Sequence, residues 1–291
     1  MAFLIPDKIE EIYFGGKKIR IRKKIIPNEL RATKYVARWC REGDPIKPCA
    51  LLNDKSGNPR AITVHNTGAI KAAAGTTMGE QYSRATYNGN MGGTIVSFYV
   101  SGYDDIWQLL ETAPGKAEQG WHATDLDTRT FANKGGTYRM VGGNVDTISI
   151  ECIGPGEEAE DATARLCAYL CKQHGLNPLV DVYPHKFFYP VKNCPAYILP
   201  HWDKFIAKVE TYYAIEKGER AELYRVGTAW ENGKCIGQRG AFSYLENAKK
   251  FCRHGEKVFD NEGKVVFERP PLTLKNILKE LNEPWRMNTR E

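Results

Sequence analysis

Apolar and polar positions along the first 213 residues follow two different periods. Short runs rich in apolar and β-branched residues predict strands at 61–64, 94–100, 106–110 and 147–153. Apolar residues spaced three and four apart predict helices at 28–41, 78–87, 159–174 and 200–213. This mixture of strands and helices predicts an α/β domain.

The pattern also predicts a hairpin over residues 9–26, with its turn at Gly15-Gly16. Its second half alternates isoleucines with lysines and arginines, so one face packs and the other faces water. We favour an edge hairpin whose charges prevent aggregation, because such edges are common. Contact with an anionic polymer is the alternative.

The pattern changes near residue 217, where a polar segment predicts a linker. Beyond it, a strand at 223–230, a helix opened by the capping box Ser243–Glu246, and a hairpin over 257–267 predict a β-α-β-β module. A last short helix is expected at 274–281. We therefore expect a domain at 1–213, a linker at 214–222 and a small α+β domain at 223–291.

Composition argues against a nucleic-acid-binding protein and against a membrane-spanning one. The chain is 42% hydrophobic with a net charge of +6, and residues 217–291 carry 15 Lys and Arg against 11 Asp and Glu. A mild positive charge suits an anionic surface, but no block of basic residues interleaved with aromatics predicts a nucleic-acid groove. No apolar run reaches the roughly 20 residues of a transmembrane helix.

The start of the sequence lacks the long apolar core of a secretory signal. We therefore expect the protein to accumulate in the cytoplasm and to act elsewhere only after release. The eight cysteines include no Cys-x-x-Cys pair, and in that compartment most of them should be reduced and buried.

The segment 183–195 concentrates candidate chemistry. It holds His185, Lys192 and Cys194, and its prolines argue against a helix. His65 leaves the end of the strand at 61–64, where sites form in open α/β sheets. Two imidazoles and one thiolate make a catalytic zinc site that leaves one position for water.

Hydrolysis at such a zinc also needs a group that handles protons and one that stabilises an oxyanion. Glu151 lies on the polar face of the strand at 147–153 and can be the first, although a solvated face is an equal alternative. Lys192 is placed to be the second, although a plain exposed lysine is the commoner case.

A rival metal site is conceivable on the helix at 159–174. Cys167, Cys171 and His174 share one helical face. A single helical face offers neither a fourth ligand nor an open cavity, so we expect the cysteines to fill the core and the histidine to cap the helix.

Four motifs follow one another along the chain: Val64-His65-Asn66-Thr67, Gly120-Trp121-His122-Ala123, Asn144 to Glu151, and His185 with Lys192-Asn193-Cys194-Pro195. In this order they resemble the motifs of the zinc N-acetylmuramoyl-L-alanine amidases, whose fold is shared with peptidoglycan recognition proteins and phage amidase lysozymes. The resemblance covers about residues 45–210 and is specific because four separate motifs agree. It implies a central mixed β-sheet flanked by helices.

The resemblance also implies roles for individual residues. His65, His185 and Cys194 correspond to the zinc ligands, Lys192 to the lysine before the third ligand, and Glu151 to a catalytic acid and base. His122, Trp121 and Thr67 are expected to lie beside the substrate and not on the metal.

One position departs from the family. Relatives often carry a catalytic tyrosine on the strand at 94–100, where this chain has Phe98 followed by Tyr99. Either Glu151 takes the whole proton role or Tyr99 is shifted into the place of that tyrosine. We favour Glu151, because Tyr99 points to the opposite face from Phe98.

The reaction implied is hydrolysis of the amide between the lactyl group of N-acetylmuramic acid and L-alanine, with Zn²⁺ as cofactor and peptidoglycan as substrate. The last domain resembles modules that follow clostridial amidases, which implies binding to a cell-wall polymer. Two alternatives remain, a recognition protein that binds peptidoglycan without cutting it and a zinc hydrolase of other small amides. The oligomeric state is left open.

Overall fold

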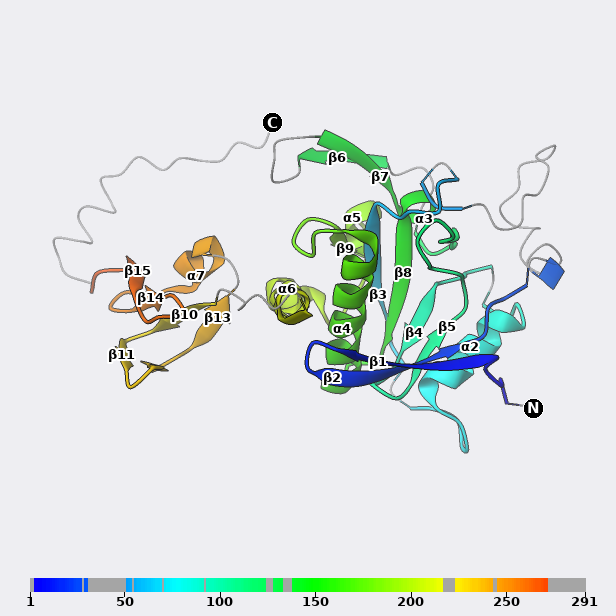
Figure 1. Cartoon of the computed structure of the whole chain (residues 1–291), viewed down its shortest axis with the longest axis horizontal. Helices are drawn as coiled ribbons and strands as arrows, with labels where there is room; N and C mark the ends of the chain where they lie inside the picture. The colour runs from blue at the N-terminus through cyan, green and yellow to red at the C-terminus, as the bar shows by residue number, and fades with distance from the viewer. Residues whose placement is uncertain are drawn as a thin grey trace. The chain divides into compact units, whose positions relative to one another are not determined.

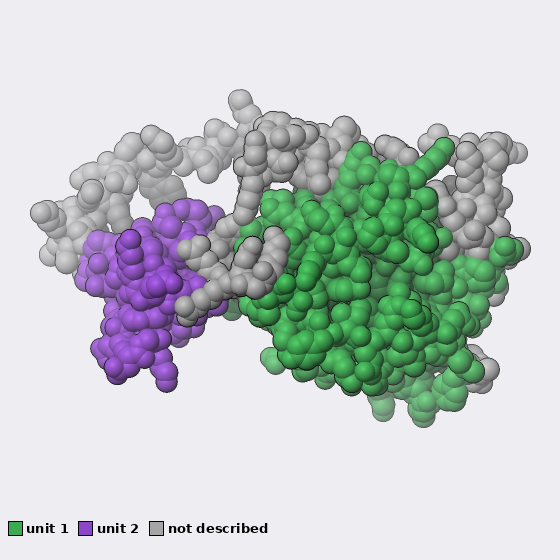
Figure 2. Space-filling view, viewed as in Figure 1, with its two compact units in different colours: residues 1–219 green, residues 220–291 purple. Residues whose placement is uncertain are grey.

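The chain forms two compact units, residues 1–219 and 220–291 (Figure 2). The computed structural model describes residues 3–27, 29–30, 51–53, 55–69, 71–91, 93–123, 128–132, 138–216, 223–242 and 245–271. The helices expected at 28–41 and 274–281 lie outside the described residues, apart from residues 29–30. The expected linker overlaps the end of a helix up to residue 216, and its remainder also lies outside them.

The first unit is built on a seven-stranded mixed sheet (Figure 1). Its strands are β1 (Lys8–Phe14), β2 (Lys17–Lys23), β3 (Ala61–Thr67), β4 (Phe98–Val100), β5 (Ile106–Gln108), β8 (Thr147–Ile153) and β9 (Val182–Pro184). They lie in the order β1-β2-β5-β4-β8-β3-β9. The last four run parallel, so the carboxyl ends of β4, β8, β3 and β9 meet at one edge.

Helices cover both faces of this sheet. The long helix α4 (Glu157–His174) packs with α6 (Trp202–Glu216) over the face formed by Ile62, Ile150 and their neighbours. On the other face, α2 (Met78–Tyr87) packs against a second apolar cluster that includes Tyr99 and Trp107. The expected mixed sheet flanked by helices is confirmed.

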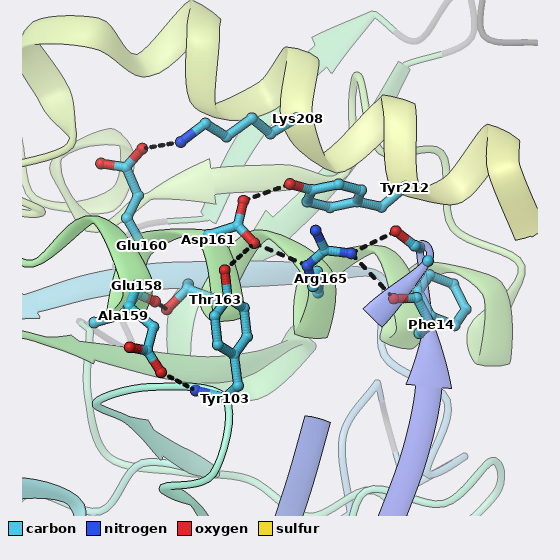
Figure 3. A network of polar contacts seen from close by, with 12 residues as sticks. Phe14, Tyr103, Glu158, Ala159, Glu160, Asp161, Thr163, Arg165, Lys208 and Tyr212 are labelled. Atoms are coloured by element: carbon cyan, nitrogen blue, oxygen red, sulfur yellow. Dashed lines mark hydrogen bonds and ion pairs between the residues drawn. The ribbon is translucent and has the colours of Figure 1, made fainter. Parts of the chain in front are cut away.

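The expected hairpin at 9–26 forms β1 and β2, with β1 at the edge of the sheet. Gly15 and Gly16 make the two-residue turn at φ +59° and +82°, a region that residues with a side chain rarely adopt. A hydrogen-bond network joins this turn to α4 (Figure 3). The Arg165 guanidinium donates to the carbonyls of Phe14 and Gly15.

Some boundaries differ from the sequence-based expectation. His65 lies inside β3 and not beyond it, because the strand continues to Thr67. Between the predicted strands at 106–110 and 147–153, where no element was predicted, lie a hairpin of β6 (Thr128–Ala132) and β7 (Tyr138–Gly142) and the short helix α3 (Gly143–Asp146). The segment 183–195 does contain one helical turn, α5 (His185–Phe188), which starts directly after Pro184.

The second unit has its own apolar core around Val226, Phe242 and Val258. Its elements are β10 (Tyr224–Gly227), β11 (Ala229–Glu231), β12 (Lys234–Ile236), β13 (Gly240–Phe242), α7 (Leu245–Phe251), β14 (Lys257–Phe259) and β15 (Val265–Glu268). The helix and final hairpin were expected, whereas β12 and β13 were missed. Ser243, the expected helix cap, lies outside the described residues.

No helix among the described residues is both long enough and apolar enough to cross a membrane.

Candidate metal centre

His65 and Glu151 lie side by side on the two central strands. Parallel pairing of β3 and β8 puts His65 level with Glu151, so both side chains project from the same face of the sheet. This is the face on which α2 packs, because Thr63 and His65 alternate with the core residues Ile62 and Val64 of the opposite face. The His65 side chain is 3% exposed.

His185 and Cys194 are brought together because the segment between them, residues 185–194, folds back on itself. His185 is the first residue of α5, and the Lys186 amide next to it donates to the Cys194 carbonyl at 2.8 Å. Asn66, the residue after His65, accepts the Tyr197 amide at 3.2 Å and donates to the Cys152 carbonyl at 2.9 Å. Asn66 thereby connects the segment after Cys194 to strands β3 and β8.

Three possible ligand atoms converge as a result. One ring nitrogen each from His65 and His185 and the sulfur of Cys194 lie within 4.8 Å of one another. The His65 Nδ1 to Cys194 Sγ distance is 3.9 Å. His185 Nδ1 is buried without a hydrogen-bond partner among the described residues. Two nitrogens and a sulfur at this spacing, one of them an orphaned buried nitrogen, fit a tetrahedral zinc ion.

The electrostatics suit metal ligands. Burial, together with the charge of Lys192, lowers the pKa of His185 to about 4, and burial lowers the pKa of His65 well below its usual value. Both imidazoles are therefore neutral at pH 7, which is the form that binds a metal. Burial raises the pKa of the Cys194 thiol to about 11, so a bound cation would be needed to hold it as thiolate.

Glu151 and Lys192 border this cluster. Burial raises the pKa of the Glu151 carboxyl to about 8, and the nearby positive charge of Lys192 opposes that rise. Lys192 is exposed, and its charge also acts on His65, His185 and Cys194. The structure thus gathers all five residues that were expected to carry catalysis.

Comparison with known proteins assigns the part of the chain that holds this cluster to a family. Residues 55–197 match the family described as N-acetylmuramoyl-L-alanine amidase, and the match contains the whole cluster. Residues 55–197 belong to the N-acetylmuramoyl-L-alanine amidase family.

Relatives of this amidase domain include one curated protein. The N-acetylmuramoyl-L-alanine amidase CwlH of Bacillus subtilis (strain 168) is 32% identical over 153 residues, which are 51% of this chain and 52% of the relative. The chain thus spans about half the length of the curated relative that it matches.

Two solved structures are also similar to this chain. A mutant endolysin from Bacillus subtilis is 26% identical with a TM-score of 0.45, covering 66% of this chain and 99% of that one. The catalytic domain of XlyA is 26% identical with a TM-score of 0.44, covering 65% and 98%.

The floor of the amidase site is polar and buried, not a solvated face. The hydroxyls of Thr63 and Thr147 are 2.6 Å apart on neighbouring strands. The Ser97 amide donates to Ser149 Oγ at 2.8 Å. These fully buried hydroxyls bond to one another or to the backbone, so they line the sheet beneath His65 and Glu151 at little cost.

The three residues expected beside the substrate are placed differently from one another. His122 is 8% exposed and lies against His65, outside the three-ligand cluster. Trp121 packs partly buried on the second apolar cluster. Thr67 ends β3, and its hydroxyl accepts the Ala69 amide at 3.3 Å. Contact of these residues with substrate stays a prediction.

Contrary to the expectation from the sequence, Tyr99 lies on the same face of the sheet as the amidase site. Tyr99 does point away from Phe98, which packs in the opposite cluster, but the amidase site lies on the side of Tyr99. Tyr99 is the register partner of Glu151, and its hydroxyl is 2.8 Å from Thr86 Oγ1 of α2. The preference for Glu151 therefore rests on its place beside His65 and not on the face of the sheet.

The rival cluster on α4 is not a metal site. Cys167 and Cys171 are fully buried in the core, and burial raises the pKa of both thiols. His174 Nε2 lies 3.0 Å from the Thr112 carbonyl. Among the described residues, the group formed by His65, His185 and Cys194 is the one with metal-ligand spacing.

Proposed function

We propose that the chain is a zinc-dependent peptidoglycan hydrolase that cleaves the amide between N-acetylmuramic acid and L-alanine. The convergence of His65, His185 and Cys194 within 4.8 Å, inside a segment of the amidase family, carries this proposal. The spacing of these donors supports zinc as the ion, and so does the buried Nδ1 of His185, which has no hydrogen-bond partner among the described residues.

His65, His185 and Cys194 would hold the zinc ion through two nitrogens and one sulfur. When bound, zinc supplies Lewis acidity and lowers the pKa of water toward neutrality. The neutral imidazoles of the two histidines keep the net charge of the site positive, which favours an attacking oxygen at neutral pH.

Glu151 would move the proton. In its ionised form the Glu151 carboxyl, whose pKa is raised to about 8, can accept a proton from the attacking water and return it to the nitrogen of the leaving L-alanine. The same carboxyl therefore serves both halves of the amide hydrolysis.

Lys192 would stabilise the developing oxyanion. Its ammonium group acts electrostatically on both histidines, on Cys194 and on Glu151, so its charge would also act on a substrate carbonyl held among them. A fixed positive charge lowers the activation free energy most where negative charge develops in the transition state.

Digestion of purified sacculi tests the bond that is cut. We expect new amino termini of L-alanine and no new reducing ends, together with free stem peptides by mass spectrometry. New reducing ends would identify a glycosidase, and binding to sacculi without any product would identify a recognition protein. Zinc in the purified protein without release of stem peptides would identify a hydrolase of other amides.

We further propose that residues 223–291 bind a cell-wall polymer. An apolar core of their own and the excess of positive charge over residues 217–291 support a separate module that concentrates the enzyme at an anionic surface.

A further inference from the structure

His122 makes a direct contact with a candidate zinc ligand. Its Nδ1 lies 2.9 Å from His65 Nε2, and the two rings meet edge to face at 89°. Both side chains are buried, with 8% of His122 and 3% of His65 exposed. Little of the His122 ring is left to touch a substrate, and its polar contacts include His65 and the Thr147 backbone.

The two nitrogens of His65 have different partners. Nδ1 faces the Cys194 sulfur at 3.9 Å, so it is the nitrogen directed at the ion. A neutral histidine that binds a metal through one nitrogen carries its proton on the other. His65 Nε2 is then a donor, and the nitrogen within hydrogen-bond distance of it is His122 Nδ1.

His122 is held in place from its backbone. Asn144 Oδ1 accepts the amides of His122 at 2.8 Å and Ala123 at 2.7 Å, and Asn144 Nδ2 donates to the Ala123 carbonyl at 3.0 Å. Gly120 lets this segment lie against the sheet, because a Cβ there would come within 2.7 Å of the Ile95 carbonyl oxygen. The backbone that carries the His122 ring is therefore held by contacts within the protein.

We propose that His122 is a positioning residue for the zinc ligand His65. Its Nδ1 accepts the His65 Nε2 proton, which fixes the tautomer and the ring orientation that turn Nδ1 of His65 to the metal. This role rests on the proposed zinc chemistry and is an alternative to the predicted contact between His122 and substrate. It also gives the buried Asn144 a function, since Asn144 fixes the backbone that carries the acceptor.

Two substitutions separate this role from a structural one. His122→Phe keeps a ring of similar size without the acceptor, and His122→Asn keeps an oxygen near the position of Nδ1. In competition with a chromophoric chelator, we expect His122→Phe to bind zinc about 10–100-fold more weakly and His122→Asn to recover most of that loss. With saturating zinc, KM for a soluble muropeptide should stay unchanged while kcat falls in the Phe variant.

A matched control is His174→Phe, which changes a histidine bonded to the Thr112 carbonyl and should leave zinc affinity unchanged. If His122→Phe fails to fold, nitrogen NMR of the zinc-loaded wild type decides. We expect protons on His65 Nε2 and His122 Nε2 and none on His122 Nδ1. A protonated His122 Nδ1 would overturn the proposal.

Further outcomes separate the two proposals. A folded His122→Phe protein with wild-type zinc affinity and a raised KM would show a substrate contact and overturn the positioning role alone. A wild-type protein that binds no zinc would overturn the proposed function as well.

Discussion

The chemistry of this site depends on which side chains share a face of the sheet. Pairing of β3 with β8 places His65 level with Glu151, and a shift of one residue would turn one of them into the core with Ile62 and Ile150. The buried hydroxyls of Thr63 and Ser149 follow the same alternation. The site is therefore set by strand register, not by the loops alone.

Glu151 is the residue whose loss should affect chemistry without affecting metal. Glu151→Gln keeps the size of the side chain but cannot take up a proton, so activity on sacculi should fall about 10²–10⁴-fold. Zinc content should stay at the wild-type level in the same preparation. Glu157→Gln, an exposed glutamate in the first turn of α4, is the control and should be fully active. Full activity of Glu151→Gln would remove this carboxyl from the mechanism.

The sequence was sufficient to predict that His65, His185 and Cys194 would converge, because two histidines and a cysteine in such motifs favour a shared metal site. The sequence was not sufficient to predict that His122 contacts Nε2 of His65. Nor did it predict that Tyr99 lies on the same face of the sheet as the metal site. Those placements depend on the pairing of β4, β8 and β3, which no local pattern determines.

At the scale of elements, a buried arginine joins the N-terminal hairpin to the helical layer. Arg165 of α4 is 9% exposed, donates to Asp161 at 2.8 Å and to the hairpin carbonyls, and stacks on Tyr212 of α6 at 3.8 Å. Asp161 also accepts hydrogen bonds from Tyr103 and Tyr212 (Figure 3). The hairpin is therefore part of the catalytic unit.

Arg165→Met should destabilise this unit without altering the site. The change leaves the Phe14 and Gly15 carbonyls and Asp161 without a charged donor, and we expect a loss of about 2–4 kcal/mol in the free energy of unfolding. Urea unfolding of the purified protein measures it. Arg20→Met is the control, because Arg20 pairs with Glu11 at the surface, where ion pairs contribute little. Equal stability of the two variants would contradict the anchoring role.

Long elements were more predictable than short ones. The 18 residues of α4 show helical spacing and end at Gly175, which adopts φ +64°. By contrast, the three residues of β9 and the four of α5 were not predicted, because both depend on neighbours that complete their hydrogen bonds. The same reason explains why β6, β7, β12 and β13 were missed.

At the scale of the whole molecule, we propose that one of the two compact units hydrolyses the amide and the other binds the cell-wall polymer. The amidase segment lies in residues 1–219, and residues 220–291 form the other compact unit. A tethered binding module raises local concentration at a polymer but adds nothing to the bond-breaking step.

Removal of residues 220–291 should therefore separate binding from catalysis. The shortened chain should hydrolyse a soluble muropeptide at the full rate and should bind and digest sacculi more weakly. Sedimentation with sacculi and a soluble-substrate assay measure the two properties. Unchanged binding to sacculi would contradict the wall-binding proposal, and the soluble-substrate rate controls for folding of the catalytic unit.

The most direct test of the account is X-ray absorption at the zinc edge on the purified protein. We expect one zinc per chain, with one sulfur at about 2.3 Å and two nitrogens at about 2.0–2.1 Å, and loss of the sulfur in Cys194→Ala. A protein that contains no zinc, or a zinc shell without sulfur, would contradict the claim that His65, His185 and Cys194 bind one ion.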